Sequence, residues 1–410
     1  MKTFNVPVTY RSPLITAIKN KRRKDDKLKK DFSPTLLDFG VLRIYLARHF
    51  GFCYGVENAI EIAFRTIDEN PGKRIFLLSE MIHNPQVNAD LKERGIQFLQ
   101  DTYGKQLIPF DSIGADDIVL IPAFGTTLQV EKILQEKGIH TEKYNTTCPF
   151  VEKVWNRGEQ IAGNGYSIVI HGKPKHEETR ATFSHAAATA PAVIVNDLEE
   201  AKSLAQYIVG EKDPALFYNE FAGRFSEGFN VSKDLQRLGV INQTTQLATD
   251  TQAIAEYLKK IIQQHYLLTE SNIAERFADT RDTLCYATND NQSAATGMLD
   301  TPADLAIVVG GYNSSNTTHL VELCEEKLPT YFISSEEKIL PGGAILHYDF
   351  HTKQELLTQG YLPEQSPVSI LLTSGASCPD AVVEAVIRKL ANRYSVESKM
   401  EEMIQGKFDV

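Results

Sequence analysis

The sequence predicts an α/β protein built on parallel sheets, and two observations lead to this fold class. Short runs rich in Val, Ile and Leu recur along the 410 residues without strict polar alternation, the pattern of strands buried on both faces. Helical stretches separate these runs, and strand–helix alternation is typical of parallel sheets covered by helices. The candidate strands are residues 41–47, 74–80, 117–124, 166–172, 192–196, 237–243, 305–311, 329–335 and 368–375.

The stretch between the first two candidate strands illustrates the helical pattern. Residues 54–67 read YGVENAIEIAFRTI and place Val56, Ala59, Ile60 and Ala63 on one stripe. An apolar stripe of this kind lets a helix bury one face.

Three segments depart from the alternation. Residues 1–42 lack a clear core pattern and are expected to form a polar N-terminal extension. Residues 210–236 interrupt the rhythm and are interpreted as an insertion, and residues 393–410 are expected to form a polar C-terminal tail. At roughly 150 residues per domain, the length suggests two or three domains.

Composition and charge argue against several classes of protein. Apolar residues make up 42% and charged residues 23%, as in a globular chain, and the net charge of −10 makes a nucleic-acid partner improbable. No run approaches the roughly 18 apolar residues of a membrane span. The N-terminus has no apolar core of signal-peptide type. Five widely separated cysteines do not form a disulfide framework, so a cytoplasmic location is expected.

One basic run stands out against this acidic background. Residues 19–30 read KNKRRKDDKLKK, with Asp25 and Asp26 interrupting the positive charge. The run is interpreted as a solvated helix, while a segment that binds nucleic acid or an anionic surface, or that directs targeting, is the alternative.

Three cysteines share a sequence setting that suits metal ligation. Cys53 and Cys148 follow turn-like segments and precede helical patterns, and Cys285 lies in TLCYATNDNQSA. A helix N-terminus favours the thiolate, and thiolates are the ligands of iron–sulfur clusters. Taken singly, each cysteine is as compatible with a small buried apolar residue, the role expected for Cys324. Cys378 does not share the setting.

Three loops that open helices point to an anionic ligand. They lie at residues 79–91, 313–323 and 374–386, and each places Ser, Asn or His at the start of a helical pattern. Helix N-termini bind phosphate through free N–H groups, and ligands of open α/β sheets lie beyond the strand C-termini. Ordinary helix capping by Ser and Asn is the alternative.

Two further segments carry groups that can move protons. Residues 171–183 read HGKPKHEETRATF and include His176, Glu177 and Glu178, although solvated surface charge explains them as well. The segment NQTT places Thr244 after a strand, either as a hydroxyl donor or as a helix cap.

The motifs GFCYGVENAI, HNP, TTCPFV, HGKPKHEET, NQTT, CYAT, NSSN and SGASCPD follow one another between about residues 43 and 390. In this order they are highly specific. The chain resembles the LytB family of 4-hydroxy-3-methylbut-2-enyl diphosphate reductases, the last enzymes of the non-mevalonate isoprenoid route. PAFG and HGKPKHEET resemble the cyanobacterial and plant branch of that family.

The resemblance implies three α/β lobes in a pseudo-threefold trefoil around a central [4Fe–4S] cluster. We place these lobes at residues 43–148, 149–282 and 283–392. By transfer, the three cluster ligands are Cys53, Cys148 and Cys285, and the fourth iron is open to the substrate hydroxyl.

The resemblance also implies the reaction and the residues that serve it. Two electrons and two protons expel water from (E)-4-hydroxy-3-methylbut-2-enyl diphosphate and leave isopentenyl and dimethylallyl diphosphate, with ferredoxin or flavodoxin as the electron donor. Glu178 matches the proton-relay glutamate and Thr244 the relay threonine, although the adjacent Glu177 leaves the register open by one residue. The positions that match substrate-binding residues are His83, His176, Thr244, Ser314, Ser315, Asn316 and Ser377.

One position departs from the family pattern. Phe124 stands in PAFG where many members carry a histidine that contacts the diphosphate, and His171 is the candidate substitute. Two other classes of protein remain open from the residues alone. One is an iron–sulfur hydro-lyase, which removes water without net electron uptake, and the other is a non-enzymatic Cys/His protein that holds zinc structurally.

Overall fold

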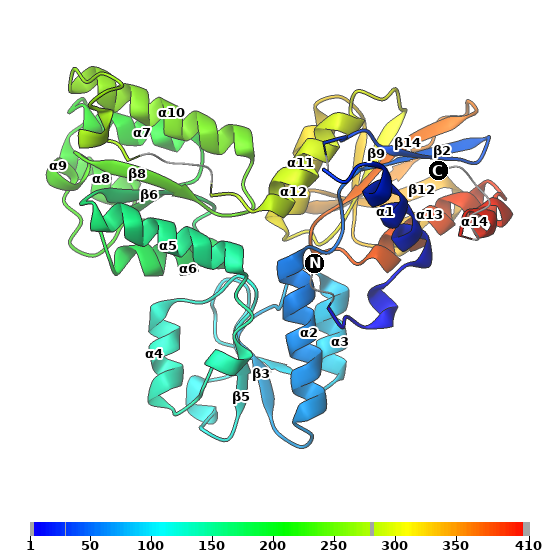
Figure 1. Ribbon diagram of the computed structural model, residues 1–410, viewed down its shortest axis with the longest axis horizontal. Coiled ribbons are helices and arrows are strands. Elements are labelled where there is room, and N and C mark those ends of the chain that lie inside the picture. The colour runs from blue at the N-terminus through cyan, green and yellow to red at the C-terminus, as the bar shows by residue number, and fades with distance from the viewer. Residues whose placement is uncertain (1–3, 29, 279–282, 405–410) are drawn as a thin grey trace. The chain divides into compact units, whose positions relative to one another are not determined.

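The computed structural model describes residues 4–28, 30–278 and 283–404 (Figure 1). Its contacts divide the chain into two compact units. The first unit comprises Met1–Glu61, His83–Val87 and Tyr286–Val410, and the second comprises Ile62–Ile82 and Asn88–Cys285. The chain passes between the units within α2 (Tyr54–Glu69) and α3 (Pro85–Glu93), and also after Ile82 and after Cys285.

The first unit is built on a five-stranded sheet with the order β1-β2-β14-β9-β10. All neighbours are parallel except β1 and β2. A three-stranded antiparallel sheet, β11-β12-β13, lies in the same unit. The strands are β1 (Thr35–Asp38), β2 (Leu42–Leu46), β9 (Leu305–Val309), β10 (Thr330–Ile333), β11 (Ile339–Leu340), β12 (Ala344–Asp349), β13 (Gln354–Gln359) and β14 (Val368–Ser374). The helices are α1 (Pro13–Asp25), α11 (Tyr286–Met298), α12 (Ser315–Glu325), α13 (Asp380–Arg393) and α14 (Glu397–Ile404).

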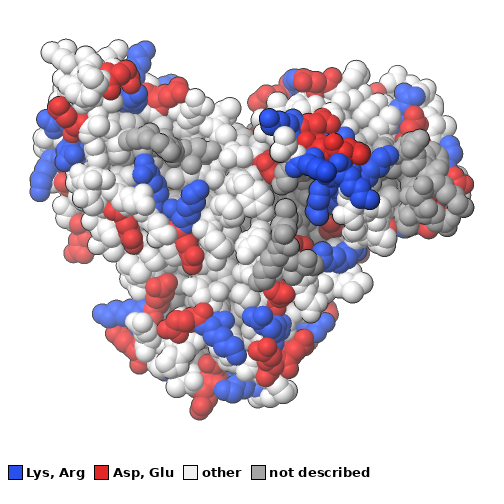
Figure 2. Space-filling view, in the orientation of Figure 1, with Lys and Arg blue, Asp and Glu red and all other residues white. Residues whose placement is uncertain are grey.

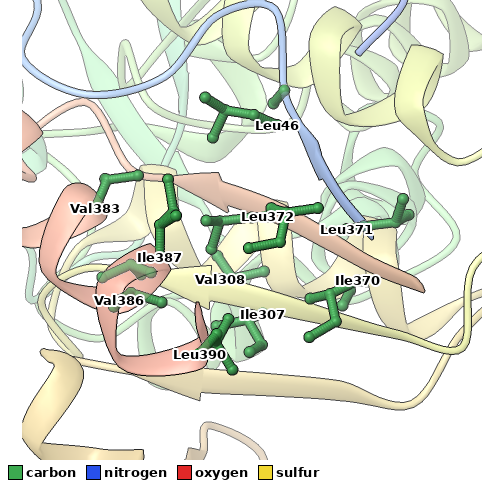
Figure 3. Close-up of a cluster of buried hydrophobic side chains, with 14 of the residues drawn as sticks. Leu46, Ile307, Val308, Ile370, Leu371, Leu372, Val383, Val386, Ile387 and Leu390 are labelled. Carbon is green, nitrogen blue, oxygen red and sulfur yellow. The ribbon is translucent and has the colours of Figure 1, made fainter. Parts of the chain in front are cut away.

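The core of the first unit forms where α13 covers the middle of the sheet. Figure 3 shows Ile387 and Leu390 of α13 beside Leu372 of β14 and Ile307 of β9, all of them fully buried. The helix can cover the sheet because its apolar residues recur every three or four positions. Burial of such side chains stabilises the fold by roughly 1.5–3 kcal/mol each.

The second unit contains two separate three-stranded parallel sheets, with the orders β4-β3-β5 and β7-β6-β8. Their strands are β3 (Ile75–Leu77), β4 (Gln97–Phe98), β5 (Ile118–Leu120), β6 (Ser167–His171), β7 (Ala192–Val195) and β8 (Leu238–Asn242). The helices are α4 (Leu128–Glu136), α5 (Pro149–Gly163), α6 (Glu177–Ala187), α7 (Leu198–Ile208), α8 (Pro214–Glu220), α9 (Val231–Asp234) and α10 (Ala248–His265).

The structure confirms the predicted α/β class with parallel sheets, and every predicted strand is present. The strand β2, at the start of the range 43–148, pairs with β14 of the first unit. The lobe boundaries at residues 148 and 282 stay a prediction. Residues 210–236, interpreted as an insertion, contain α8 and α9.

The expectation of a polar N-terminal extension is wrong in one respect. Tyr10, Leu14 and Ile15 are almost fully buried, and the helix α1 begins at a Ser12 cap whose hydroxyl accepts the N–H of Ile15. The pattern escaped notice because the apolar stripe occupies only the first half of α1, and charge dominates the second half. The predicted helix over residues 19–30 is confirmed from Lys19 to Asp25, whereas residues 26–28 and Lys30 lie outside the helix and Lys29 lies outside the described residues.

The C-terminal segment also contributes to the core. Met400, in α14, is fully buried in the core of the first unit, so the expected polar tail is wrong for this residue. Residues 405–410 lie outside the described part of the chain. Within that described part, no helix has the length and apolar character needed to cross a membrane.

Candidate active site

Each of the three candidate cluster ligands directly precedes a helix. Cys53 comes before α2, and its carbonyl oxygen accepts the N–H of Glu57 at 3.0 Å. Cys148 is the N-cap of α5, with Pro149 at the first helical position, and Cys285 comes before α11. None of the three forms a disulfide bond within the described part of the chain, and all three are partly exposed, whereas Cys324 and Cys378 are buried. The helix starts predicted after Cys53 and Cys148 are therefore confirmed. Cys285 also directly precedes a helix.

Burial dominates the electrostatics of Cys148. It raises the pKa of this thiol to about 12, and the backbone N–H groups of Phe150 and Val151 lower it by less. The helix start therefore favours the Cys148 thiolate as expected, but desolvation outweighs this effect and the net shift of the pKa is upward. The charges of Cys285 and Glu178 raise the pKa further, so both groups lie near this sulfur.

Glu178 and Thr244 form a bidentate pair in the second unit. The backbone N–H of Thr244 donates to one carboxylate oxygen of Glu178 at 2.5 Å, and the Thr244 hydroxyl donates to the other at 3.0 Å. Both side chains are almost fully buried. The backbone N–H of Cys285 in turn donates to the carbonyl oxygen of Thr244 at 3.3 Å. Within the second unit, a hydrogen bond thus links the predicted proton-relay pair to Cys285, a predicted cluster ligand.

Glu177 has a different environment from its neighbour. Its carboxylate accepts a hydrogen bond from the hydroxyl of Ser79, at the end of β3. His176 caps α6 by accepting the N–H of Glu178 on Nδ1 at 3.2 Å. The two hydrogen bonds from Thr244 to Glu178 favour Glu178 over Glu177 as the relay residue.

Gln243 supports this group and was missed from the sequence. Its side-chain oxygen accepts the hydroxyl of Thr179 at 2.8 Å and the backbone N–H of Lys173 at 3.2 Å. Its amide nitrogen donates to the hydroxyl of Thr245 at 2.7 Å. Gln243 therefore fixes the loop after β8 to the first turn of α6, and its place directly before Thr244 in NQTT was the available signal.

The first unit gathers the predicted anion-binding residues of three loops. The Ser377 hydroxyl donates to the carbonyl oxygen of His83 at 3.0 Å, and the backbone N–H of Ala376 donates to Oδ1 of Asn316 at 2.9 Å. The backbone N–H of Cys53 donates to the carbonyl oxygen of Ala376 at 3.2 Å. Hydrogen bonds therefore link the loops that carry Ser377, Asn316, His83 and Cys53.

Two neighbours of these residues set the shape of the loop group. Ser314 is the N-cap of α12, and its hydroxyl accepts the N–H of Thr317 at 3.3 Å, while Ser315 is buried in the first turn. Gly311 precedes them, where a Cβ would lie 2.3 Å from the carbonyl oxygen of His83. Only glycine permits this approach between the two loops.

Asn316 carries an unsatisfied donor in this group. Its Nδ2 is buried and donates no hydrogen bond to any residue that the structure describes, although Oδ1 is engaged. A buried donor without an acceptor costs about 1–3 kcal/mol. An anionic ligand would supply that acceptor, which ordinary helix capping does not explain.

The N-terminal segment packs on the loop that carries Cys53. The ring of Tyr10 meets Phe52 edge to face, with 5.9 Å between centroids, and Phe4 meets Tyr54 likewise at 4.9 Å. Residues on both sides of Cys53 are thus held by a segment that sequence reasoning left without a role. The apolar positions Phe4 and Tyr10 were the only signal.

Phe124 and His171 do not share one environment. The rings of Phe124 and His176 meet edge to face, with 5.8 Å between centroids. His171 ends β6, is almost fully buried, and contacts the hydroxyl of Thr251 in α10 through Nδ1 at 2.9 Å. That His171 replaces the missing diphosphate contact stays a prediction. Phe124 packs against His176, a predicted substrate-binding residue.

The cysteines suit a cluster by their chemistry. Among the described residues, no group of three or more His, Cys, Asp and Glu side chains is arranged around a single metal ion. The three candidate ligands are nevertheless partly exposed, lie at helix starts and form no disulfide with the described residues, and Cys148 and Cys285 are electrostatic neighbours. Cysteine sulfurs that are not held in disulfides are the ligands that iron–sulfur clusters need.

Comparison with known proteins places the chain among reductases. A relative from Synechococcus sp. (strain RCC307), named 4-hydroxy-3-methylbut-2-enyl diphosphate reductase, is 43% identical over 352 residues, covering 86% of this chain and 84% of the relative. A relative of the same name from Prochlorococcus marinus (strain MIT 9313) is 39% identical over 392 residues, covering 95% and 92%. These cyanobacterial relatives confirm the branch that the motifs indicated.

Two solved structures share the fold. One, of (E)-4-hydroxy-3-methyl-but-2-enyl diphosphate reductase, has a TM-score of 0.51 and 24% identity, and covers 85% of this chain and 99% of its own. The other, of the E-1-hydroxy-2-methyl-but-2-enyl-4-diphosphate reductase from Plasmodium falciparum, has a TM-score of 0.60 and 22% identity, covering 85% and 88%. At these identities the likeness concerns the fold alone. The family described as LytB protein matches residues 44–391, and with the cyanobacterial relatives this match shows that the chain belongs to the LytB family.

Proposed function

We propose that this enzyme reduces (E)-4-hydroxy-3-methylbut-2-enyl diphosphate to isopentenyl and dimethylallyl diphosphate, the last step of the non-mevalonate isoprenoid route. The names of relatives about 40% identical support the substrate. The observation that carries the proposal is the Glu178–Thr244 pair, which lies beside Cys148 and is bonded to the backbone of Cys285. A buried carboxylate held next to candidate cluster ligands suits a reaction that consumes protons and electrons together.

The reaction balances with two electrons and two protons. The bond between carbon and the hydroxyl oxygen breaks, and the hydroxyl leaves as water after taking one proton. The second proton adds to carbon, at one of two positions, which gives the two isomeric products. No other oxidant or reductant than the electron donor is needed.

Cys53, Cys148 and Cys285 are the proposed ligands of a [4Fe–4S] cluster. When bound, such a cluster supplies electrons and an iron that acts as a Lewis acid toward the hydroxyl. The protein's part is to present thiols at three helix starts and to keep Cys324 and Cys378 buried and apart from this role.

Glu178 is the proposed proton carrier, and Thr244 positions it. The two hydrogen bonds from Thr244 fix both carboxylate oxygens, and His176 is held at the start of the same helix by the N–H of Glu178. Proton transfer by a positioned side chain contributes typically 10²–10⁴-fold to a rate. Burial of Glu178 excludes bulk water from competing for that proton.

The diphosphate is proposed to bind donors that carry little fixed charge. These donors are His83, His176, Thr244, Ser314, Ser315, Asn316 and Ser377. The unsatisfied Nδ2 of Asn316 supports this assignment, because a phosphate oxygen is a suitable acceptor. Each bond from such a donor to a charged oxygen is worth roughly 1.5–3 kcal/mol.

Anaerobic turnover with a reduced one-electron donor tests the proposal. The expected result is consumption of two electrons for each molecule of isopentenyl or dimethylallyl diphosphate formed. Loss of water without electron uptake would identify a hydro-lyase instead. A colourless protein that binds zinc and forms no product would support a structural metal site. Ferredoxin or flavodoxin is the proposed physiological donor, and the cytoplasmic location stays a prediction.

A further inference from the structure

The second half of α1 and the turn after it expose cations that the fold does not use. Arg23, Lys24, Lys27 and Lys30 are exposed, and none of them forms a side-chain ion pair or hydrogen bond with the described residues. Figure 2 shows blue side chains gathered where Figure 1 places α1. These four residues are called the α1 cation surface below.

The acidic residues of the same segment are already occupied. Asp26 accepts the backbone N–H groups of Lys30 at 3.1 Å and Asp31 at 3.0 Å, and lies 3.8 Å from Arg48. Asp31 pairs with Arg22 at 3.0 Å. The carboxylates of Asp26 and Asp31 are thus paired with Arg48 and Arg22. Neither arginine belongs to the α1 cation surface. Its four cations face solvent with Asp25 as the exposed acidic neighbour.

The same helix contacts the segment that leads to Cys53. Nη2 of Arg48 donates to the carbonyl oxygen of Arg22 at 3.4 Å, and Nζ of Lys19 lies 4.6 Å from the centre of the Phe50 ring. Residues 48–50 therefore connect α1 directly to the loop of Cys53. A molecule docked on the α1 cation surface would contact the helix that packs against residues 48–50, next to the loop of the proposed cluster ligand Cys53.

We propose that the α1 cation surface docks an acidic electron-transfer protein. The inference rests on the proposed function, because that reaction takes two electrons from an outside donor, which is oxidised by one electron at each of two encounters. Charge complementarity favours a compact acidic protein, since opposite patches steer association and raise its rate by 10–10³. The net charge of −10 of the whole chain disfavours an extended polyanion such as duplex DNA.

Binding tests the docking without requiring turnover. The dissociation constant of the holoenzyme for an oxidised plant-type ferredoxin of net negative charge is measured by calorimetry for the wild type and the triple variant Arg23→Glu, Lys24→Glu, Lys27→Glu. The matched control reverses three exposed cations of the second unit, Lys105→Glu, Lys233→Glu and Lys260→Glu. The expected result is binding weakened about tenfold or more in the α1 variant and within about twofold in the control.

Kinetics separate docking from chemistry. With ferredoxin as donor, kcat/KM of the α1 variant should fall about tenfold, whereas turnover with reduced methyl viologen should stay unchanged. Equal loss with both donors, equal loss in the control variant, or unchanged ferredoxin binding would overturn the proposal. So would tighter binding of the wild type to duplex DNA or phosphatidylserine vesicles than to ferredoxin. Absence of turnover with either donor would refute the proposed function, and the calorimetry would still decide the docking.

Discussion

Thr244 donates its backbone N–H and its hydroxyl to opposite oxygens of the Glu178 carboxylate, at 2.5 and 3.0 Å. The two residues come from α6 and from the loop after β8, which follow adjacent strands of one parallel sheet. The carboxyl ends of parallel neighbours lie at one edge, so residues 66 positions apart meet there. This pair is the strongest structural argument for the assigned proton relay.

Glu178→Gln should lower kcat by about 10²–10⁴-fold and leave iron content unchanged, because the amide oxygen can still accept the Thr244 N–H and the amide nitrogen can donate to the Thr244 hydroxyl, but the amide cannot release a proton at neutral pH. Anaerobic kinetics and iron analysis check this prediction. Glu177→Gln is the matched control, since its carboxylate contacts Ser79 instead. Near-normal turnover of Glu178→Gln, with loss in Glu177→Gln, would move the relay role by one residue.

Asn316→Ala should weaken substrate binding by about 10-fold to 150-fold, the range expected for one bond to a charged oxygen. The substituted side chain removes the buried Nδ2 that lacks a partner among the described residues. Binding of the diphosphate to the variant, measured by titration, and the KM for the diphosphate report the effect. Asn164→Ala, at the exposed end of α5, provides the control and should bind normally. Unchanged affinity of Asn316→Ala would remove Asn316 from the diphosphate site.

Tyr10→Ala should accelerate loss of the cluster in air. Tyr10 is 2% exposed and its ring lies edge to face against Phe52, one residue before Cys53. Truncating a buried aromatic residue costs about 3–5 kcal/mol and leaves a cavity beside the ligand loop. The rate of decay of the cluster's visible absorbance measures this. Tyr103→Ala, at a position 71% exposed, should decay like the wild type. Equal decay rates for all three proteins would show that the N-terminal segment does not hold the loop.

Stability should fall as the pH drops below 6.5, in part through His185. Burial lowers the pKa of this imidazole from 6.5, and its ring stacks on Trp155 with 3.7 Å between centroids. Below pH 6.5 the unfolded chain binds a proton that the folded chain resists, so the unfolding free energy decreases until the folded pKa is reached. Above pH 6.5 both states are neutral at this site and the contribution is constant.

His185→Gln isolates that contribution. Trp155 is the only tryptophan, so its fluorescence reports unfolding around this ring. When the pH is lowered from 7 to about 5.5, the midpoint of unfolding, followed by Trp155 fluorescence, should fall less in the variant than in the wild type. Parallel losses in both proteins would assign the acid sensitivity to other groups.

The sequence predicted the buried parallel strands well, because apolar runs such as those of β6 and β9 carry a strong signal. It missed β13, whose mostly exposed residues lie in a small antiparallel sheet without such a run. It also missed the burial of Leu14 and Ile15, because a half-helix stripe followed by a basic run has little net apolar character.

The candidate site shows the same division. Cys53, Cys148 and Cys285 could be picked out by motif and by the helix starts that follow them. The raised pKa of Cys148 could not, because burial is a property of the folded protein. The unsatisfied Nδ2 of Asn316 likewise depends on what the folded loops place around it.

Iron and sulfide analysis of anaerobically prepared protein, with a Mössbauer spectrum, tests most directly whether three separate thiols share one cluster. The wild type and Cys324→Ser should each contain about four iron and four sulfide per chain. Cys53→Ser, Cys148→Ser and Cys285→Ser should each lose most of that iron. Full iron content in any one of these three variants, or equal loss in Cys324→Ser, would contradict the assignment of the ligands.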